Sequence, residues 1–353
     1  MIYDFRVDIL RNYVKIGEAL CSQCRIKFDK NADVKKGMQL TMSADKIKMT
    51  KAYQGLGQSV LEYAFDMFSD RLRPVVTIDG TEHPLGIYMV ISAPESLSDT
   101  GSVYNLESYD ESMILKQSAF TERTNYTAGT EYLTVINSIL TACGFTRVVE
   151  DPTNAVLATD IEIAPGETYL SVLNTFLDGI NYEHIYMDND GYIHVQAVEN
   201  KTTADFVYSD RKNMRIIPPI TKTTDLYNLP NVLVGVCSLP ELDDPITYTK
   251  ENTDPNSKIS IPSRGYKVVK VYNLYNTADQ QALEDYIDQR YYESTQVTET
   301  VDISTAIEGG HVYGNTVQID TSLLQGLFNE TQWEIQIGSN GGMKHRLERK
   351  VFV

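Results

Sequence analysis

The chain has 353 residues, of which 42% are hydrophobic, and it carries a formal net charge of −17 at pH 7. Its length predicts two or three domains, and its apolar content excludes a disordered chain. The negative charge argues against sequence-specific nucleic-acid binding, because acidic side chains repel phosphate groups.

The charge is unevenly distributed along the chain. The first 60 residues hold 11 Lys and Arg against 6 Asp and Glu, a net charge of +5, so the remainder carries −22. The basic end is interpreted either as an assembly device or as a solvated face. No apolar run reaches the ~20 residues that span a bilayer, so we expect no stable membrane insertion. The acidic, alternating start MIYDFRVDIL is not typical of a signal peptide, and we expect folding in the cytoplasm.

Residues 1–118 are predicted to form a small β-barrel domain. Short runs rich in β-branched and aromatic residues are separated by Gly, Pro, Asp or Ser, as in antiparallel barrels and sandwiches. These runs are QCRIKFD, MQLTM, RPVVTIDG, PLGIYMVIS and SVYNLESYD. The segment Ser59–Phe68 fits both a helical turn and a further strand.

Cys21 and Cys24 form an isolated C-x-x-C pair. A zinc site would need a second such pair or a histidine pair at matching spacing, and a redox pair would need the N-terminus of a helix. The segment CSQCRIKFD instead alternates apolar and polar residues. We therefore predict a strand in which the cysteines act as small apolar residues.

Residues 119–200 are predicted to form a small α+β middle domain. Two amphipathic helices carry their apolar stripes on Tyr132, Ile136 and Ile139 and on Tyr169 and Leu173, respectively. Aligned at an offset of 37, Gly129–Leu140 and Gly166–Leu177 share Gly, Tyr, Leu, Val, Asn and Leu. The likeness is that of a duplicated unit or of two helices that converged on the same kind of sheet.

The acidic run Asp188-Asn189-Asp190-Gly191 is either part of a calcium loop or a hairpin turn. With Gly191 at position 6, an EF-hand would place Tyr186 at position 1 and Ala197 at position 12, so the first and last ligands are missing. Asp-Gly between runs of strand-forming residues is typical of a tight turn, which we predict here.

The sequence gives little indication of catalysis. It contains no phosphate-binding, dinucleotide-binding, HExxH or GxSxG motif. His184 and His194 flank the predicted turn, where they either face each other across it and bind a metal or are half-buried polar residues. We predict no catalytic, cofactor-binding or metal-binding residues, no cofactor and no enzyme.

Residues 201–353 are predicted to form a second β-barrel domain with one helix and a long polar loop. The strands are LPNVLVGVC, GYKVVKVYN, TVQIDTS and QWEIQIGS, and the helix is TADQQALEDYIDQRYYE, with Thr277 as its N-cap. The loop SLPELDDPITYTKENTDPNSKISIPSRG is rich in Pro, Asn, Asp and Ser, which is typical of a flexible or partner-contacting segment. The fold class is therefore α+β, mainly β, with two barrels that flank the middle domain.

The order of these elements resembles that of phage tail baseplate hub proteins, the late-control-protein family of contractile injection systems. The stretch DRLRPVVTIDGTEHPLGIYMVISAPESLSDTGSVYNLESYDESMIL is similar to the family's N-terminal barrel, and GETYLSVLNTFLDGINYEHIYMDNDGYI is similar to its helix–hairpin unit. LPNVLVGV, ENTDPNSKIS and the later helix resemble the start of its second barrel.

The resemblance implies a structural virion protein of the tail tip or baseplate, assembled in the host cytoplasm. Such hubs are homotrimers whose two tail-tube-like barrels per subunit make a pseudo-six-fold ring between a six-fold tail tube and a three-fold spike. The implied partners are the tail tube or distal tail protein, the spike or tip protein and other baseplate proteins, with DNA passing through an acidic lumen. The closing GGMKHRLERKVFV is expected to be a last strand with no appended enzyme.

Two alternatives belong to other functional classes. One is a peptidoglycan hydrolase or glycosidase of the tail tip, with catalytic acids far apart in sequence. The other is a glycan- or receptor-binding tail component, since the 23 tyrosines suit contact surfaces.

Overall fold

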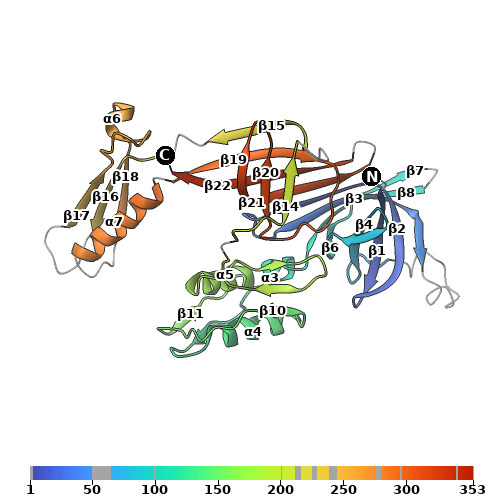
Figure 1. Cartoon of the computed structure of the whole chain (residues 1–353). Helices are drawn as coiled ribbons and strands as arrows, with labels where there is room; N and C mark the ends of the chain where they lie inside the picture. The colour runs from blue at the N-terminus through green and yellow to red at the C-terminus, as the bar shows by residue number, and fades with distance from the viewer. Residues whose placement is uncertain are drawn as a thin grey trace. The chain divides into compact units, whose positions relative to one another are not determined.

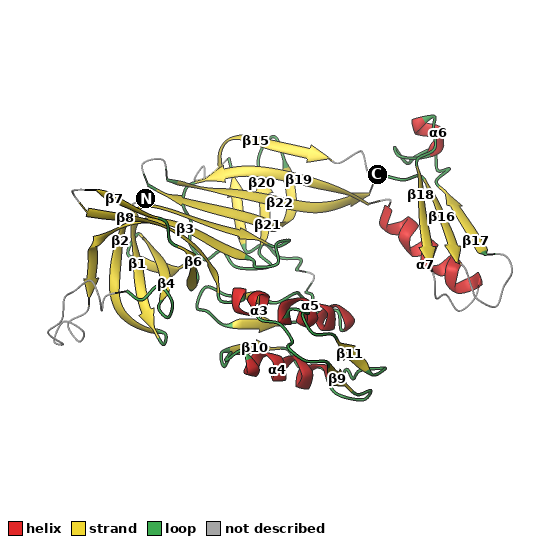
Figure 2. Ribbon diagram, turned by 180° about the vertical axis from the view of Figure 1, so that it is seen from behind, coloured by secondary structure: helices red, strands yellow, loops and turns green. Residues whose placement is uncertain are grey.

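The computed structural model describes ten segments of the chain. These are residues 3–49, 65–98, 101–199, 201–210, 216–224, 229–237, 245–274, 280–294, 296–338 and 341–352. The described residues are mainly in strands, with helices in the middle of the chain and near residue 290 (Figures 1 and 2). The mainly β fold class predicted from the sequence is confirmed. Among the described residues, no helix is long and apolar enough to cross a membrane.

The chain divides into two compact units. The first unit contains residues 1–219 and 303–346, and the second contains residues 220–302 and 347–353. The predicted division into domains at residues 118 and 200, with two tail-tube-like barrels, stays a prediction. In the structure, residues 303–346 lie in the first unit, because their strands pair with strands from the start of the chain.

Most strands belong to one large sheet. The strands on its main path, in chain order, are β1 (Tyr3–Arg11), β2 (Val14–Asp29), β3 (Lys36–Met49), β4 (Arg71–Ile78), β6 (Tyr88–Ser92), β8 (Gly101–Asp110), β15 (Ile216–Thr224), β19 (Gln296–Thr305), β21 (Gln325–Ile337) and β22 (Gly342–Phe352). Their order in the sheet is β1-β4-β6-β8-β3-β2-β21-β22-β19-β15. Because β1 also pairs with β2, the six strands from the start of the chain form a closed ring of pairings.

Four short strands join the sheet beside this path. β5 (Thr81–Pro84) pairs with β4, β7 (Glu95–Ser98) with β8, β20 (Thr316–Asp320) with β21, and β14 (Phe206–Ser209) with β20. The β14–β20 pair is parallel, whereas β20 and β21 run antiparallel.

The core of the large sheet mixes both ends of the chain. Cys24, Ile26 and Phe28 alternate inward on β2, as predicted, and the Phe28 ring stacks on the single tryptophan, Trp333 of β21, at 5.7 Å. Cys21 is half-buried, and burial raises the pKa of its thiol to about 11. The predicted strand through the C-x-x-C pair is confirmed, with Cys24 packed among apolar residues of the core.

The middle of the chain forms a second core in the first unit. It contains three helices, α3 (Met113–Gln117), α4 (Tyr132–Ala142) and α5 (Tyr169–Gly179), and the short strands β9 (Thr124–Tyr126), β10 (Val148–Glu150), β11 (Ile161–Ile163), β12 (Tyr186–Met187) and β13 (Ile193–Val195). Both predicted amphipathic helices are confirmed as α4 and α5, because the apolar stripes of both are buried in one core.

The second unit contains a small sheet of its own with one long helix, besides parts of β15, β19 and β22. Strands β17 (Ile246–Glu251), β16 (Val232–Cys237) and β18 (Val269–Leu274) lie in that order, and α7 (Gln280–Ser294) packs on β16. Gly235 makes this close approach possible, since a Cβ there would lie 2.7 Å from Ile287 of the helix.

The predicted polar loop between β16 and β18 is partly wrong. It contains β17 and the short helix α6 (Ile261–Arg264). Its polar composition conceals a strand, because ITYTKE alternates half-buried and exposed residues and covers one side of β16. Thr277 and most of Ser59–Phe68 lie outside the described residues, so the N-cap and the ambiguous segment stay predictions.

Candidate functional site

The acidic run 188–191 is a hairpin turn, as predicted. Asp188 Oδ1 accepts hydrogen bonds from the backbone N–H groups of Asp190 and Tyr192, both at 2.9 Å. Gly191 has φ +80°, a conformation that glycine adopts without strain, and a Cβ there would also displace the end of the Ile87 side chain, which would lie 2.7 Å away.

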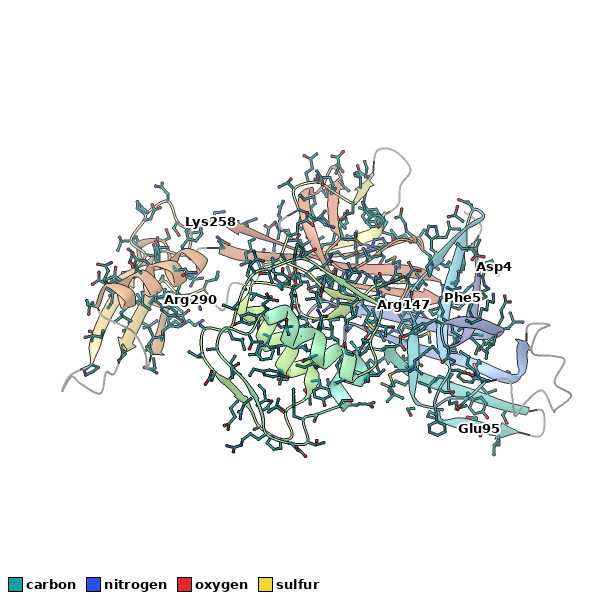
Figure 3. The ribbon with its side chains drawn as sticks, turned by 90° about the horizontal axis from the view of Figure 1, so that it is seen from below. Asp4, Phe5, Glu95, Arg147, Lys258 and Arg290 are labelled. Atoms are coloured by element: carbon teal, nitrogen blue, oxygen red, sulfur yellow. The ribbon has the colours of Figure 1, made fainter. Side chains whose placement is uncertain are left out.

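The tip of this hairpin is buried against the large sheet. Asn189 is 7% exposed; its Oδ1 accepts from Lys36 Nζ at 2.6 Å and its Nδ2 donates to the His311 carbonyl at 3.0 Å. Beside the tip, the guanidinium of Arg147 (labelled in Figure 3) lies over the ring of Tyr192, 4.2 Å from its centroid. Through these contacts, the hairpin links β3 to the segment that carries His311.

Lys36 and Asp110 place two ionisable groups beneath the hairpin. Both are 1% exposed. Burial lowers the pKa of Lys36 to about 8, although the charge of Asp110 opposes the shift. Burial raises the pKa of Asp110, although hydrogen bonds from Ser112 and the backbone N–H of Lys36 oppose it. Each group is hydrogen-bonded, which is what a buried ionisable group requires.

His184 and His194 do not face each other. His194 lies opposite Tyr186 in the hairpin register, and their rings stack at 4.7 Å. Its Nε2 lies 3.1 Å from Asp188 Oδ2, whereas the half-buried His184 lies 3.0 Å from Asp178. The suggestion of a cross-strand pair is wrong, because His184 precedes the paired residues of β12.

A pocket of about 370 Å³ lies beside His184, and hydrogen bonds join the side chains that line it. Glu183 Oε1 accepts from Lys30 Nζ at 3.1 Å, and its Oε2 accepts from Tyr313 at 2.5 Å. The polar groups that line the pocket therefore bind one another.

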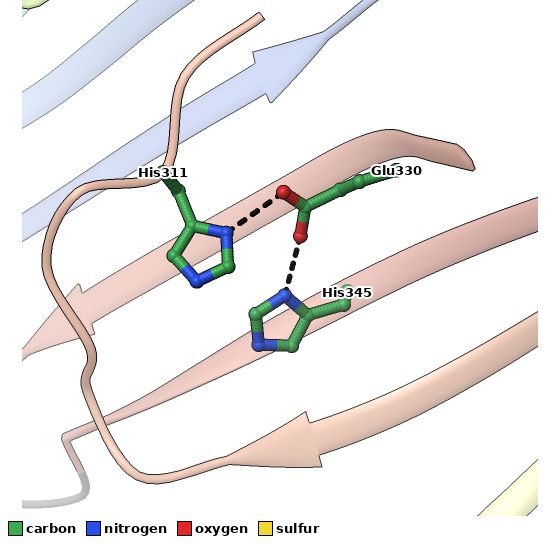
Figure 4. A group of neighbouring side chains, drawn as sticks. All are labelled: His311, Glu330 and His345. Carbon is green, nitrogen blue, oxygen red and sulfur yellow. Dashed lines mark hydrogen bonds and ion pairs between the residues drawn. The ribbon is translucent and has the colours of Figure 1, made fainter. Parts of the chain in front are cut away.

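A cluster of two histidines and a glutamate lies deep in the large sheet (Figure 4). His311 precedes β20, Glu330 lies on β21 and His345 on β22, and their exposures are 2%, 1% and 2%. His311 Nδ1 lies 2.7 Å from Glu330 Oε2, and His345 Nδ1 lies 2.6 Å from Glu330 Oε1. We call these three residues the His–Glu–His cluster.

Polar and aromatic groups surround the His–Glu–His cluster. His345 Nε2 lies 2.9 Å from Thr305 Oγ1, and His311 Nε2 lies 3.3 Å from the hydroxyl of Tyr208. The ring of Phe206 stacks on that of His311 at 3.9 Å. Contacts from residues of β14, β19, β21 and β22 thus fix the positions of the two imidazole rings.

Burial and charge act in opposite directions on the cluster. Burial alone would raise the pKa of Glu330, but the charge of His311 and the hydrogen bonds from both histidines lower it overall. For His345, burial lowers the pKa, and Glu330 opposes the shift. The three side chains can act as a hydrogen-bonded triad or as ligands of a divalent metal, and their burial closes them to a substrate.

The His–Glu–His cluster was not predicted from the sequence. Its residues lie 19 and 15 positions apart, and the pairing of the consecutive strands β20, β21 and β22 brings them together. The signal that could have indicated it is the alternation of buried residues along each strand. His345 alternates with the buried Met343 and Leu347, and Glu330 lies two residues after the buried Phe328. Ionisable residues at buried strand positions are rare unless they are paired.

The structure is similar to several solved structures, two of which are tail proteins. A tail protein from Neisseria meningitidis MC58 is 13% identical with a TM-score of 0.66, and the match covers 98% of this chain and 96% of that one. The prophage MuSo2 43 kDa tail protein from Shewanella oneidensis is 10% identical with a TM-score of 0.65, and the match covers 98% of both chains. A chain of the Francisella PdpA–VgrG complex is 8% identical with a TM-score of 0.62, and the match covers 98% of this chain and 53% of that one.

No protein-family model and no curated protein matches the sequence. The likeness therefore concerns the fold. At that level, the resemblance to phage tail and baseplate proteins that the sequence indicates is confirmed.

Proposed function

We propose that this chain is a structural component of a phage tail or phage-like particle, and that it forms the trimeric hub at the distal end of the tail. In this role it adapts the six-fold tail tube to a three-fold spike or tip. Its partners are two further copies of itself, the tail tube or distal tail protein, the spike or tip protein and other baseplate proteins.

The observation that supports this proposal is the extent of the fold match. It covers 98% of this chain and 96% and 98% of the two bacterial tail proteins, so the likeness extends through both compact units. The closed ring of pairings among β1, β2, β3, β4, β6 and β8 is the kind of element that a tube-like barrel requires.

The charge distribution suits a channel that DNA crosses. The 293 residues after position 60 carry −22, and an acidic lumen would let DNA pass without binding. A chain with this role needs no catalytic residue, and we propose none. A cell-wall hydrolase or a glycan-binding tail component remains the alternative, and no contact in the described residues favours either.

The mass of the full chain in solution, with and without its tail-tube neighbour, tests the hub. We expect a complex of three times the 39.8 kDa chain mass, whose averaged electron-microscopy images show a three-fold ring. A chain that stays monomeric with that neighbour present would contradict the proposal. Clearing of peptidoglycan in a zymogram, abolished by one carboxylate substitution, would establish the hydrolase instead.

A further inference from the structure

The two contacts inside the His–Glu–His cluster each bring a ring nitrogen close to a carboxylate oxygen. The Nδ1 atoms of His311 and His345 face separate oxygens of Glu330, at 2.7 and 2.6 Å. A carboxylate oxygen cannot approach an unprotonated ring nitrogen this closely without repulsion. Either a proton or a metal ion therefore lies in each contact.

Thr305 indicates where the ring proton of His345 lies. The Thr305 hydroxyl donates to the carbonyl of Ala306 at 2.8 Å, and a carbonyl can only accept. Its oxygen is therefore the acceptor in the 2.9 Å contact with His345, and Nε2 carries the hydrogen. In a neutral ring this leaves Nδ1 as a lone pair that points at Glu330.

This tautomer is the one that metal-binding histidines adopt. A ligating imidazole usually donates its other N–H to an oxygen of the protein, which fixes the ring for the metal. In this cluster the N–H of His345 is fixed by Thr305, and the ring of His311 is held by the stack with Phe206. Two imidazoles and one carboxylate form a donor set that zinc commonly takes.

We propose that the His–Glu–His cluster binds a divalent transition-metal ion, Zn²⁺, through Nδ1 of His311, Nδ1 of His345 and the carboxylate of Glu330. The ligand atoms of the three residues lie within 4.8 Å of one another. Zinc holds nitrogen and oxygen ligands at 2.0–2.2 Å, so binding requires the three side chains to reorient from their present nitrogen–oxygen contacts of 2.7 and 2.6 Å.

The bound ion has a structural role. The three ligands come from the segment before β20, from β21 and from β22, so one ion joins three parts of the sheet. The exposures of 1–2% leave no room for a substrate at the metal. This role does not depend on the hub function, because it concerns the folding of each chain.

Refolding the wild-type chain with and without zinc tests the proposal. The chain is unfolded with a chelator, refolded with Zn²⁺ or in buffer alone, separated from free metal by gel filtration and analysed for its elements. We expect about one zinc ion per chain and a melting temperature several degrees above that of the metal-free protein. Wild-type protein that refolds without retaining zinc would overturn the proposal and leave a proton-linked triad.

Variants localise the ion. Glu330→Gln and His345→Asn remove a ligand, and we expect both to lose the zinc. Thr305→Val keeps the size of its side chain but removes the oxygen behind His345, and we expect zinc affinity to fall about 10–100-fold. The matched control is His184→Ala, which removes a half-buried histidine at 3.0 Å from a carboxylate and should keep one zinc ion per chain. Zinc retained by Glu330→Gln and His345→Asn would place the ion elsewhere and refute the assignment.

Discussion

The first unit buries ionisable side chains, whereas the second buries mainly amides and hydroxyls. In the first unit, Asp8, Lys36, Asp110 and the His–Glu–His cluster are all at most 2% exposed. In the second, the polar residues that are at most 1% exposed are Asn231, Asn252 and Ser260. Glu299, at 8%, is the buried acid among the second unit's described residues.

The difference lies in what each kind of buried group requires. A buried charge has lost its hydration and must be compensated by charge and hydrogen bonds together. A buried amide needs hydrogen bonds alone: Asn231 donates to the carbonyls of Ile259 and Tyr266 and accepts from Val268 N–H. The first unit should therefore be sensitive to pH and to single charge substitutions, and the second should be much less so.

The largest expected effect is that of Glu330→Gln in the first unit. The variant removes the carboxylate that contacts two buried histidines, and each buried polar group left without its partner costs about 1–3 kcal/mol. Trp333 is the single tryptophan and lies in the first unit's core, so its fluorescence in a urea titration reports this unit. The titration is run in chelator to separate the effect from metal binding, and a loss below about 1 kcal/mol would remove the contrast between the units.

The next effect is that of Asn231→Ala in the second unit. Three hydrogen-bonding groups lose their partner, two of them carbonyls, and we expect a loss of about 2–3 kcal/mol. Because no charge is involved, the loss should be the same at pH 5 and pH 8. Hydrogen exchange of the β16 amides, corrected for the intrinsic rate at each pH, measures this loss of stability. A loss that changes with pH would contradict the expected pH insensitivity of the second unit.

A smaller effect, and one that depends on pH, is expected for Asp8→Asn on β1. Burial alone would raise the pKa of Asp8, but hydrogen bonds from Lys15, Arg73 and Arg6 lower it overall. Because the folded pKa lies below the unfolded value of about 3.9, the stabilisation is complete above that pH and is lost as the pH falls through the folded pKa. We expect the variant to lose about 1–2 kcal/mol at pH 7.

The gap between wild type and Asp8→Asn should close at the acid end. Urea midpoints of Trp333 emission at pH 7, 5 and 3 measure it. A gap that stays constant down to pH 3 would mean that the Asp8 charge contributes nothing to the stability of the first unit.

The smallest effect is expected for Asp288→Ala in the second unit. Asp288 pairs with Lys250 at 3.2 Å, with side-chain exposures of 49% and 35%. Water already solvates both groups, so we expect at most about 0.5 kcal/mol. A loss as large as that of Asn231→Ala, by the same exchange measurement, would show that surface charge also stabilises this unit.

Local pattern was sufficient for part of this structure. The stripes of α4 and α5, the inward phase of Cys24, Ile26 and Phe28, and the Asp-Gly turn depend on residues close in sequence, and all are as predicted. The strand β17 was hidden because its exposed edge position keeps it polar.

Contacts between distant segments were beyond local pattern. The pairing of β2 with β21 joins residues about 300 positions apart, and the alternation pattern of either strand does not indicate which strand it pairs with. The His–Glu–His cluster instead depends on the register between strands that are close in sequence, which the alternation within each strand does not determine.

The pairing of Cys24 with Ile337 also has a consequence for the growing chain on the ribosome. At ~5–20 residues per second, β21 emerges roughly 15–60 s after β2. During that interval the edge of β2 that β21 later covers has unpaired backbone N–H and C=O groups, which is the state in which strands join neighbouring chains. A nascent or truncated chain that ends before residue 325 therefore carries an aggregation-prone edge that β21 covers once it is made.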